Sequence, residues 1–321
     1  MIRKHENQKL ALIALGGNSI LAKGEFCDIN RQFDNTQRSM EAVIELIHKG
    51  YNFVITHGNG PQVGQIMQMV ERSKDEIAET PLGVADAMTI GSMGYMIEQT
   101  LQNVMLKQKI WRHVITVLTQ VVVDLNDPAT EECTKPIGKY YSEADALQLE
   151  KQYGWVMKLD EGREYRRYVP SPYPIDIVEK DAINDLLKNG YIVVAGGGGG
   201  IPVYFTEEKT LEGLDCVIEK DMVTMKLALA VRASLLVIIT AVPNVFLHFG
   251  TDQQIPLSKL TLSQARYYSQ KGEFASSSMA PKIQAVIEFV QADPMNKAII
   301  TDIDHLKDAL EGNAGTTITA Y

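Results

Sequence analysis

Residues 53–64 read FVITHGNGPQVG, an apolar stretch followed directly by a glycine-rich turn. Phe53–Thr56 carries no charge, which predicts a buried strand of the kind found in parallel sheets. Pro61 suits the first position of a helix, so we expect a helix over Pro61–Ser73 and a turn whose amides face whatever binds there. A strand, a turn and a helix in this order are typical of an open α/β sheet.

The same alternation continues along most of the chain and predicts a doubly wound α/β sheet. Apolar runs with few charges predict the other strands at Leu10–Leu15, Val114–Val123, Ile192–Ala195, Leu235–Thr240 and Ala298–Thr301. The expected helices are Met40–Lys49, Ala85–Lys107, Asp181–Asn189, Lys220–Arg232, Leu262–Lys271 behind a Thr261–Gln264 capping box, and Pro281–Val290.

One stretch, from Asp124 to Pro174, interrupts this alternation. It is charged, aromatic and punctuated by prolines, and it contains one expected helix, Ser142–Tyr153. Long insertions in compact α/β domains are often functional, which favours a small lid over a site. A solvated insertion without a role explains the composition equally well.

Composition sets further limits. The 321 residues are 45% hydrophobic and 22% charged, as in ordinary globular proteins, and 31 basic against 40 acidic residues give a net charge of −9. This balance argues against nucleic-acid binding but not against a small anionic substrate held by a local group of lysines.

The cysteines and the hydropathy pattern indicate a compartment. Cys27, Cys133 and Cys216 form no CxxC pair, so we expect neither a disulfide framework nor a zinc site, and a reducing cytoplasm. Met1–Lys9 has no apolar signal core, and no uncharged run reaches the ~20 residues of a membrane span. We therefore expect a soluble cytoplasmic protein with no membrane contact.

Three glycine-rich turns each follow an expected strand: Leu15–Ser19, His57–Gly64 and Gly196–Gly200. Ligands of open α/β sheets bind beyond the carboxyl ends of the strands, so the three turns could line one crevice. Glycine lets backbone N–H groups approach an oxyanion closely. None of the turns matches the P-loop or dinucleotide patterns, so the sequence predicts phosphate or carboxylate binding of another kind.

Seven short strings make the prediction more specific. They are ALGGN at Ala14–Asn18, HGNGPQVG at His57–Gly64, TKPIG at Thr134–Gly138, Val169–Ile177, Gly197–Pro202, VIEKD at Val217–Asp221 and SMAPK at Ser278–Lys282. In this order, from about residue 10 to Gly315 and Thr316, they resemble the carbamate kinases of the amino acid kinase family.

That resemblance implies a three-layer αβα sandwich with a mostly parallel sheet, formed by one domain over residues 1–321. Residues 124–174 would be an inserted, protruding lid subdomain. The implied activity is reversible phosphoryl transfer between ATP and carbamate, giving ADP and carbamoyl phosphate, in a homodimer. The implied metal is Mg²⁺, held mainly by phosphates and water. Such enzymes usually run toward ATP, in arginine or related carbamoyl catabolism.

The resemblance also implies roles for individual residues. The catalytic set is Lys135, Lys220, Asp221 and Lys282. The set implied for phosphate and substrate is Gly16, Gly17, Asn18, Gly58, Asn59, Gly60, Gly198 and Gly199, and for the nucleotide it is Thr240, Ala241, Val242, Ser278 and Met279. Phosphoryl transfer depends on positioning and charge stabilisation, which lysines and amides supply. Carbamate is already anionic, so no general base is needed, and His57 is expected to be structural.

The chain departs from the family pattern at Ala241, Pro243 and Ser277, near the expected nucleotide, and at Glu219, where an aspartate is usual. A proline removes an N–H and fixes φ, which can alter contacts to the nucleoside. Two alternatives stay open: a kinase of another small carboxylate, and a paralogue that binds nucleotide or carbamoyl phosphate without turnover.

Overall fold

The computed structural model describes residues 9–21, 28–73, 76–160, 164–275 and 278–321, except for the side chain of Asn18. Cys27 and Ser277 lie outside these residues.

Eight strands of the described chain form the central sheet, in the order β15-β17-β16-β12-β1-β2-β9-β3. Every neighbouring pair is parallel except β16 and β17. The strands are β1 (Lys9–Leu15), β2 (Tyr51–His57), β3 (Val114–Thr116), β9 (Ile192–Val194), β12 (Leu235–Ile239), β15 (Lys259–Thr261), β16 (Lys297–Thr301) and β17 (Thr316–Thr319).

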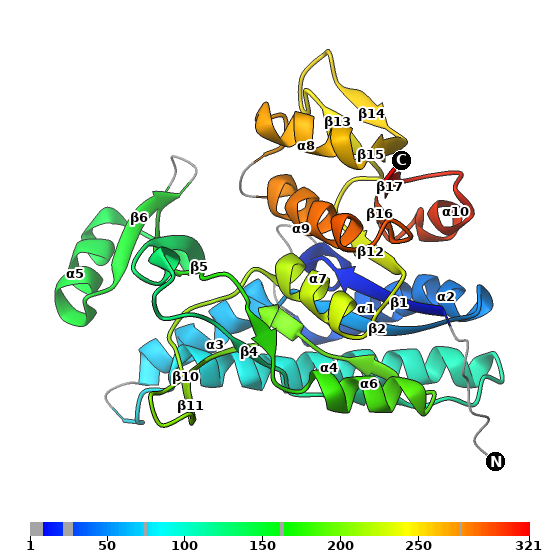
Figure 1. Cartoon of the computed structure of the whole chain (residues 1–321). Helices are drawn as coiled ribbons and strands as arrows, with labels where there is room; N and C mark the ends of the chain where they lie inside the picture. Colours follow the sequence, from blue (N-terminus) through cyan, green and yellow to red (C-terminus); the bar gives the residue numbers. More distant parts are fainter. Residues whose placement is uncertain (1–8, 22–27, 74–75, 161–163, 276–277) are drawn as a thin grey trace.

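Helices cover both faces of this sheet because its strands are apolar on both faces. In β1, Leu12 and Ala14 belong to one buried cluster, and Ala11 and Ile13 belong to another. The first cluster includes residues of α6 (Lys180–Lys188), α7 (Lys220–Ala230), α8 (Leu262–Gln270) and α9 (Met279–Ala292). The second includes residues of α1 (Ile29–Val43), α2 (Glu45–His48), α4 (Leu82–Lys107) and α10 (Leu306–Glu311). This confirms the predicted three-layer αβα fold with a mostly parallel sheet (Figure 1).

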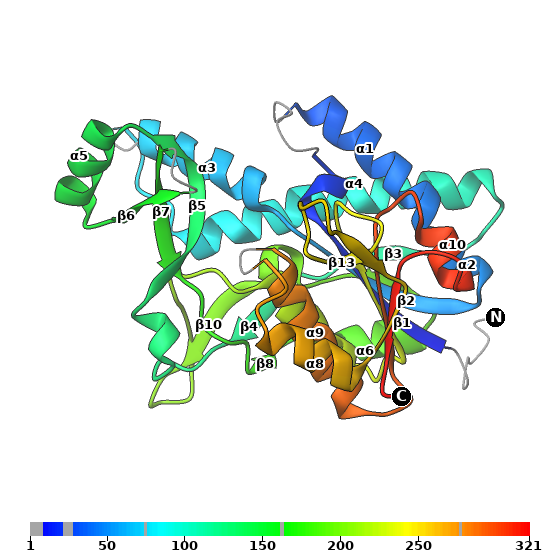
Figure 2. The same cartoon turned by 90° about the horizontal axis from the view of Figure 1, so that it is seen from above.

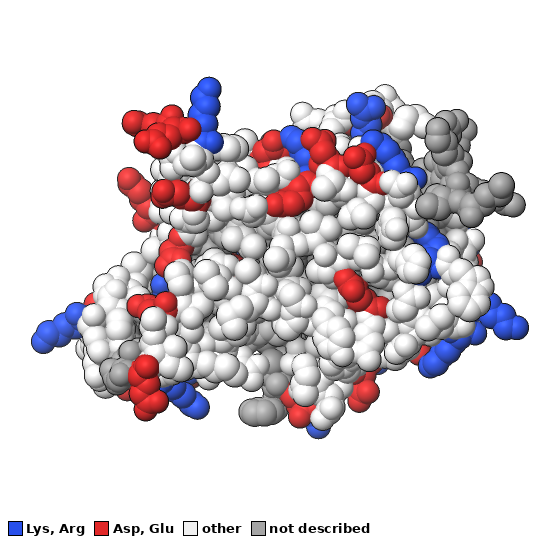
Figure 3. All heavy atoms as spheres, turned by 90° about the horizontal axis from the view of Figure 1, so that it is seen from below, with Lys and Arg blue, Asp and Glu red and all other residues white. Residues whose placement is uncertain are grey.

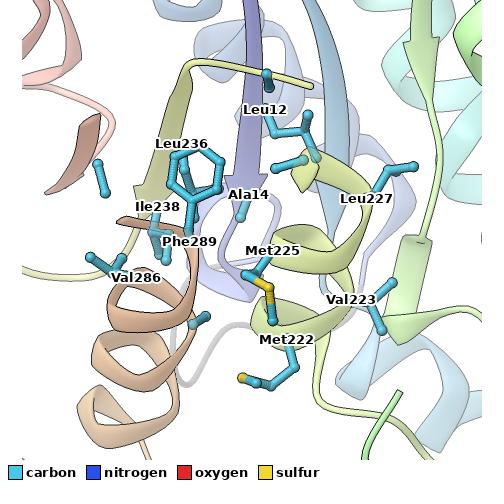
Figure 4. Close-up of a cluster of buried hydrophobic side chains, with 14 of the residues drawn as sticks. Leu12, Ala14, Met222, Val223, Met225, Leu227, Leu236, Ile238, Val286 and Phe289 are labelled. Atoms are coloured by element: carbon cyan, nitrogen blue, oxygen red, sulfur yellow. The ribbon is translucent and has the colours of Figure 1, made fainter. Parts of the chain in front are cut away.

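The first cluster fixes the two helices that carry the predicted lysines. Met222, Val223 and Met225 of α7 belong to the same buried cluster as Leu12 and Ala14 of β1, and Figure 4 shows this part of the core. From α9, Phe289 and Val286 pack beside Leu236 and Ile238 of β12 (Figure 4). All of these side chains are buried, so α7 and α9 are held side by side against the same strands.

Smaller sheets surround the carboxyl edge of the central one. A four-stranded sheet has the order β11-β10-β4-β8, with β4 (Gln120–Val122), β8 (Asp176–Ile177), β10 (Ile201–Phe205) and β11 (Leu211–Gly213). A hairpin pairs β13 (Val245–Leu247) with β14 (Ile255–Leu257). Short 3₁₀ turns occur at η1 (Gly17–Ser19), η2 (Pro128–Thr130) and η3 (Gly197–Gly199).

The interrupting stretch contains its own sheet, β5-β7-β6, formed by β5 (Cys133–Tyr141), β6 (Val156–Asp160) and β7 (Glu164–Pro170). With α5 (Glu143–Tyr153) it projects from the body beside α3 (Gly60–Ser73), as Figures 1 and 2 both show. Tyr141, Ala146, Leu149 and Met157 form its own small apolar cluster. Its base is packed against the body, because Ile137 and Val169 share a cluster with Val63 and Met67 of α3.

Two sequence predictions were wrong in their extent. Val114–Val123 is not one strand: the chain leaves the central sheet after Thr116, and β4 pairs with β10 and β8. The apolar run continues through this bend because Val121 and Val123 are also buried, so hydropathy does not mark it. The helix expected at Met40–Lys49 begins at Ile29, where the Asp28 side chain caps it, and is interrupted at Ile44. Its early buried positions, Thr36 and Ser39, are polar, which hides the periodicity.

Helix α4 approaches β3 through Gly94. A Cβ added there would lie 2.4 Å from Cγ2 of Thr116, which is closer than two carbon atoms can pack. We predict that Gly94→Ala lowers the free energy of unfolding by about 1–3 kcal/mol because the helix and the strand must separate. Chemical denaturation measures this change. Gly83→Ala on the same helix is the control, because its added methyl would meet Ile201 at an ordinary 3.7 Å. Equal stability of the two variants would contradict the close packing.

Candidate active site

The first two glycine turns meet beside the carboxyl end of β12. The Gly16 N–H donates to the Ile239 carbonyl at 3.1 Å, and the Gly58 N–H donates to the Leu15 carbonyl at 3.1 Å. A Cβ on Gly16 would lie 2.7 Å from the same Ile239 oxygen, so only glycine fits there. Gly58 lies against Gly17, whose N–H has no acceptor among the described residues. That amide is therefore a free donor for an anion.

Two predicted lysines share one carboxylate next to these turns. Lys220 Nζ lies 2.5 Å from Asp221 Oδ1, and Lys282 Nζ lies 3.0 Å from Asp221 Oδ2. Lys220 and Asp221 open α7, whereas Lys282 lies in the first turn of α9. The Lys220 side chain also lies 3.9 Å from the position of a Cβ on Gly58. The two glycine turns and the motifs that carry Lys220 and Lys282 are far apart in the sequence. The fold brings all four to the carboxyl edge of the central sheet.

The charge state of this cluster is well defined. Burial acts to raise the pKa of Asp221, but the ammonium charges of Lys220 and Lys282 outweigh it and lower that pKa to about 2. Asp221 is therefore an anion at any ordinary pH. One carboxylate between two ammonium groups leaves one net positive charge, which suits an anionic ligand.

The third predicted lysine reaches the same region from the projecting sheet. Lys135 on β5 forms an ion pair with Glu219, the residue directly before Lys220. Sequence reasoning treated Glu219 only as a departure from a family pattern. A carboxylate directly before Lys220 could have indicated that a second lysine, here Lys135, pairs with it.

The third glycine turn lies against the second. A Cβ on Gly197 would lie 2.3 Å from Nε2 of His57, and one on Gly198 would lie 2.2 Å from Nδ2 of Asn59. Burial, aided by the charge of Lys220 and opposed by a hydrogen bond with the Gly58 carbonyl, lowers the pKa of His57 to about 4. The imidazole is therefore neutral and supports the turn by packing.

Two residues of α4 at this point were missed by sequence reasoning. Asn59 Nδ2 donates to Asp86 Oδ1 at 2.7 Å and to Thr89 Oγ1 at 2.8 Å. Both residues are buried. Their spacing from Leu82 and Met93 places them on the apolar face of an expected helix. An aspartate on the apolar face of a helix is unusual, so Asp86 could have been recognised as a candidate functional residue from the sequence.

The remaining predicted residues are only partly brought together. Thr240 donates its N–H to Thr301 at 2.8 Å beside the Gly16 turn, and the Ser278 carbonyl accepts from Lys282 Nζ at 3.2 Å. No hydrogen bond within the described chain joins Thr240, Ala241 or Val242 to Ser278 or Met279. Gly60 begins α3, the added Cβ of Gly199 would meet the Ile218 carbonyl at 2.1 Å, and the Asn18 side chain lies outside the described residues.

The described residues contain neither a candidate metal site nor a candidate membrane-spanning helix. No group of three or more His, Cys, Asp or Glu side chains is placed to hold a metal ion. Among the same residues, no helix has the length and apolar character needed to cross a membrane.

The shared carboxylate gives a stability prediction. Asp221→Asn leaves two nearby ammonium groups, on side chains only 11% and 15% exposed, without an anion. We predict a loss of about 3 kcal/mol in unfolding free energy at pH 7 in anion-poor buffer. The folded pKa lies below the unfolded one, so this stabilisation is complete above about pH 4 and is lost as the pH falls toward 2.

Urea denaturation at pH 7 and pH 3 measures the difference from the unsubstituted protein. Asp185→Asn, which removes an exposed i,i+3 partner of Lys188, is the control and should change stability little. A difference that stays constant between the two pH values would refute the assignment.

Comparison with known proteins identifies the family of this chain. The model of the amino acid kinase family matches residues 9–302. A carbamate kinase of Pyrococcus horikoshii is 41% identical over 310 residues, which are 96% of this chain and 98% of that protein. The carbamate kinase-like protein YqeA of Escherichia coli is 40% identical and is covered to 99%, over 97% of this chain. The structure of carbamate kinase from Giardia lamblia bound to AMP-PNP superimposes with a TM-score of 0.91 at 37% identity, covering 98% of this chain and 99% of that one. The chain therefore belongs to the amino acid kinase family, in which these full-length relatives are named as carbamate kinases or as carbamate kinase-like.

Proposed function

We propose that this protein is a carbamate kinase, which transfers a phosphoryl group reversibly between ATP and carbamate. The observation that carries the proposal is the buried Lys220–Asp221–Lys282 cluster, held next to the free Gly17 amide at the carboxyl edge of the sheet. Full-length similarity to carbamate kinases supports the same substrate pair.

In the direction of ATP formation, an oxygen of the ADP β-phosphate attacks phosphorus of carbamoyl phosphate. A new P–O bond forms, and the bond between phosphorus and the carbamate oxygen breaks, so that carbamate leaves with the electron pair. No proton moves in this step, so no general base is required. Donor, acceptor and transferred group are all anionic, and their mutual repulsion is the main obstacle.

In the proposed reaction, the lysines reduce this mutual repulsion. Lys220 and Lys282 lie on the phosphate side in this proposal, and Asp221 holds their ammonium groups at fixed positions. The Gly17 N–H donates to the phosphoryl group in transfer, and the Gly58–Gly60 turn binds the carbamate end. Preorganised donors of this kind act strongly because they need no rearrangement during the reaction.

Residues 124–174 act as a lid in this proposal. Its sheet carries Lys135, which reaches Glu219 beside Lys220. When anionic ligands bind, the Lys135 ammonium exchanges the carboxylate of Glu219 for a phosphate oxygen. The packed base of Ile137 and Val169 on α3 supports movement of the outer part of the lid about a fixed attachment.

Mg²⁺ would be held mainly by the phosphates of the nucleotide and by water, and it would supply neutralisation of phosphate charge. Both oxygens of Asp221 accept from ammonium groups in this structure, so the chain offers cations to the phosphates at this point rather than metal ligands.

The protein is a homodimer in this proposal, and α4 forms its contact. Val84, Met88, Tyr95 and Leu106 are exposed, and their spacings of 4, 7 and 11 residues put them on one stripe of the helix. The opposite side of α4 is buried in the body, so the helix is apolar on both sides, as expected of a helix between two copies. Figure 3 views the molecule from the side along which α4 runs in Figure 1, and few charged side chains lie at the centre of that face.

The proposed cellular setting is a reducing cytoplasm, where the protein takes part in carbamoyl catabolism. Cys133 and Cys216 are free thiols, which suits a reducing cytoplasm. Carbamoyl phosphate is a reactive acyl phosphate, so its use to make ATP fits the end of arginine or related carbamoyl catabolism.

The defining experiment is ATP formation from ADP and carbamoyl phosphate with Mg²⁺. We predict turnover by the unsubstituted protein and a fall in kcat of about 10²–10³-fold in Lys220→Ala and in Lys282→Ala, because each removes a preorganised cation. Lys135→Ala should also lower kcat. Lys226→Ala is the matched control, since it removes a lysine of the same helix that stacks on Tyr173 instead.

The two alternatives give different results in the same assay. Turnover with acetyl phosphate but not carbamoyl phosphate would identify a kinase of another small carboxylate. Binding of ADP without turnover of either would identify a binding protein, and the presence of a relative named only carbamate kinase-like makes this comparison necessary.

The dimer has its own test. We predict that light scattering coupled to size exclusion gives twice the mass of the chain, and that Met88→Asp gives monomers, because a charge cannot be buried unpaired at the contact. Tyr267→Asp, on the exposed side of α8, is the control and should remain dimeric. A monomer without any substitution would disprove the contact.

A further inference from the structure

One buried carboxylate beside the site, that of Asp86, belongs to none of the ion pairs described above. Asp86 is only 1% exposed, and its Oδ1 accepts from Asn59 Nδ2. Its Oδ2 has no donor among the described residues. A buried carboxylate oxygen without a partner is costly, and packing alone does not explain it, because leucine or asparagine would fill the same space.

The contacts of Asp86 fix one side chain of the second glycine turn. Asn59 Nδ2 has two hydrogens, and these go to Asp86 and to Thr89 Oγ1 at 2.8 Å. The Thr89 hydroxyl in turn donates to the Asp86 carbonyl at 2.7 Å. The amide of Asn59 therefore cannot rotate without breaking a hydrogen bond to α4.

That amide determines where the third glycine turn can lie. A Cβ on Gly198 would be 2.2 Å from Asn59 Nδ2 and 2.8 Å from its Oδ1, so the backbone at Gly198 lies directly against the amide. Gly198 has φ of +66°, and its N–H has no acceptor within the described chain. A shift of Asn59 would shift this free donor.

Burying the carboxylate of Asp86 is electrostatically unfavourable. Burial raises the pKa of Asp86 to about 7, although the hydrogen bond from Asn59 opposes this. The buried Cys216 thiol nearby has its pKa raised to about 12 by burial and by the charges of Asp86 and Asp215. Residues that lower stability are often retained because they are needed for function, and a buried carboxylate that orients a binding turn is of this kind.

We propose that Asp86 is a positioning residue for the carbamate end of the substrate, because it holds Asn59, and through it Gly198, at the spacing that a small carbamate-like anion requires. The inference rests on the proposed function in one respect: the carbamate end of the substrate binds between these two turns. Asp86 acts through Asn59 and does not itself touch the ligand.

The test measures the KM values for carbamoyl phosphate and for ADP separately. Asp86→Leu removes the acceptor, and we expect the KM for carbamoyl phosphate to rise about ten- to a hundredfold, as for loss of a charge-assisted hydrogen bond. The KM for ADP stays unchanged, because ADP binds at the lysine side. Asp86→Asn keeps an acceptor oxygen and gives a smaller rise. Melting temperatures at pH 8 stay equal or increase, because a buried charge is removed.

Two controls separate positioning from general damage. Thr100→Val removes a buried hydroxyl of the same helix that donates only to the α4 carbonyls of Met96 and Ile97, and it should leave both KM values unchanged. In an Asn59→Ala background, Asp86→Leu should have no further effect, since Asp86 acts through Asn59. An equal rise in both KM values, or a full effect of Asp86→Leu without Asn59, overturns the proposal.

A spectroscopic measurement keeps the outcome independent of turnover. The NMR signal of the Asn59 side-chain amide, assigned by its loss in Asn59→Asp, should shift and exchange faster with water in Asp86→Leu. An unsubstituted protein without turnover refutes the proposed function, whereas an Asn59 signal that does not respond to Asp86→Leu refutes the role of Asp86.

Discussion

Two ammonium groups that share one fully buried carboxylate are the interaction on which the site depends. Lys220 and Lys282 lie in the first turns of α7 and α9, where the helix dipole disfavours cations. Asp221 offsets both the dipole and the mutual repulsion, but only if the two helices lie close enough for its two oxygens to reach both lysines. The apolar layer of Met225, Phe289 and their neighbours, packed on β1 and β12, provides that spacing. Hydrophobic packing thus determines the electrostatics of the site.

A second constraint is the close approach of backbones. Gly16 and Gly198 each lie where a Cβ would overlap a neighbouring atom, so the turns meet at distances that no other residue allows. Within the described chain, the N–H groups of Gly17 and Gly198 at these turns have no acceptor, and few side chains hold the turns in place. His57 and Asn59 do so, one by packing as a neutral ring and the other through hydrogen bonds to α4. The same helix carries the exposed apolar stripe on its other side, so one element links the proposed subunit contact to the site.

Local sequence patterns predicted those parts of the fold whose causes are local. The strand at Phe53–Thr56 and the helix behind the Thr261–Gln264 capping box follow from hydropathy and from hydrogen bonds within a few residues, and both are present. The prediction failed at Val114–Val123, where both halves of an apolar run are buried but in different sheets. It also failed before Met40, where buried Thr36 and Ser39 are polar. In both places, segments that are distant in the sequence determine whether these residues are buried and which sheet or helix they pack against.

The sequence alone determined the α/β class, the family, the three glycine turns and the candidate lysines, because each is a contiguous string whose meaning does not depend on distant residues. The tertiary structure decided the pairings: Asp221 with both Lys220 and Lys282, Lys135 with Glu219, and Asn59 with Asp86. These partners, the adjacent Lys220 and Asp221 apart, are separated by tens of residues in the chain. Their ion pairs and hydrogen bonds form over a few ångströms, and only the packing of helices on the sheet brings the partners within that range.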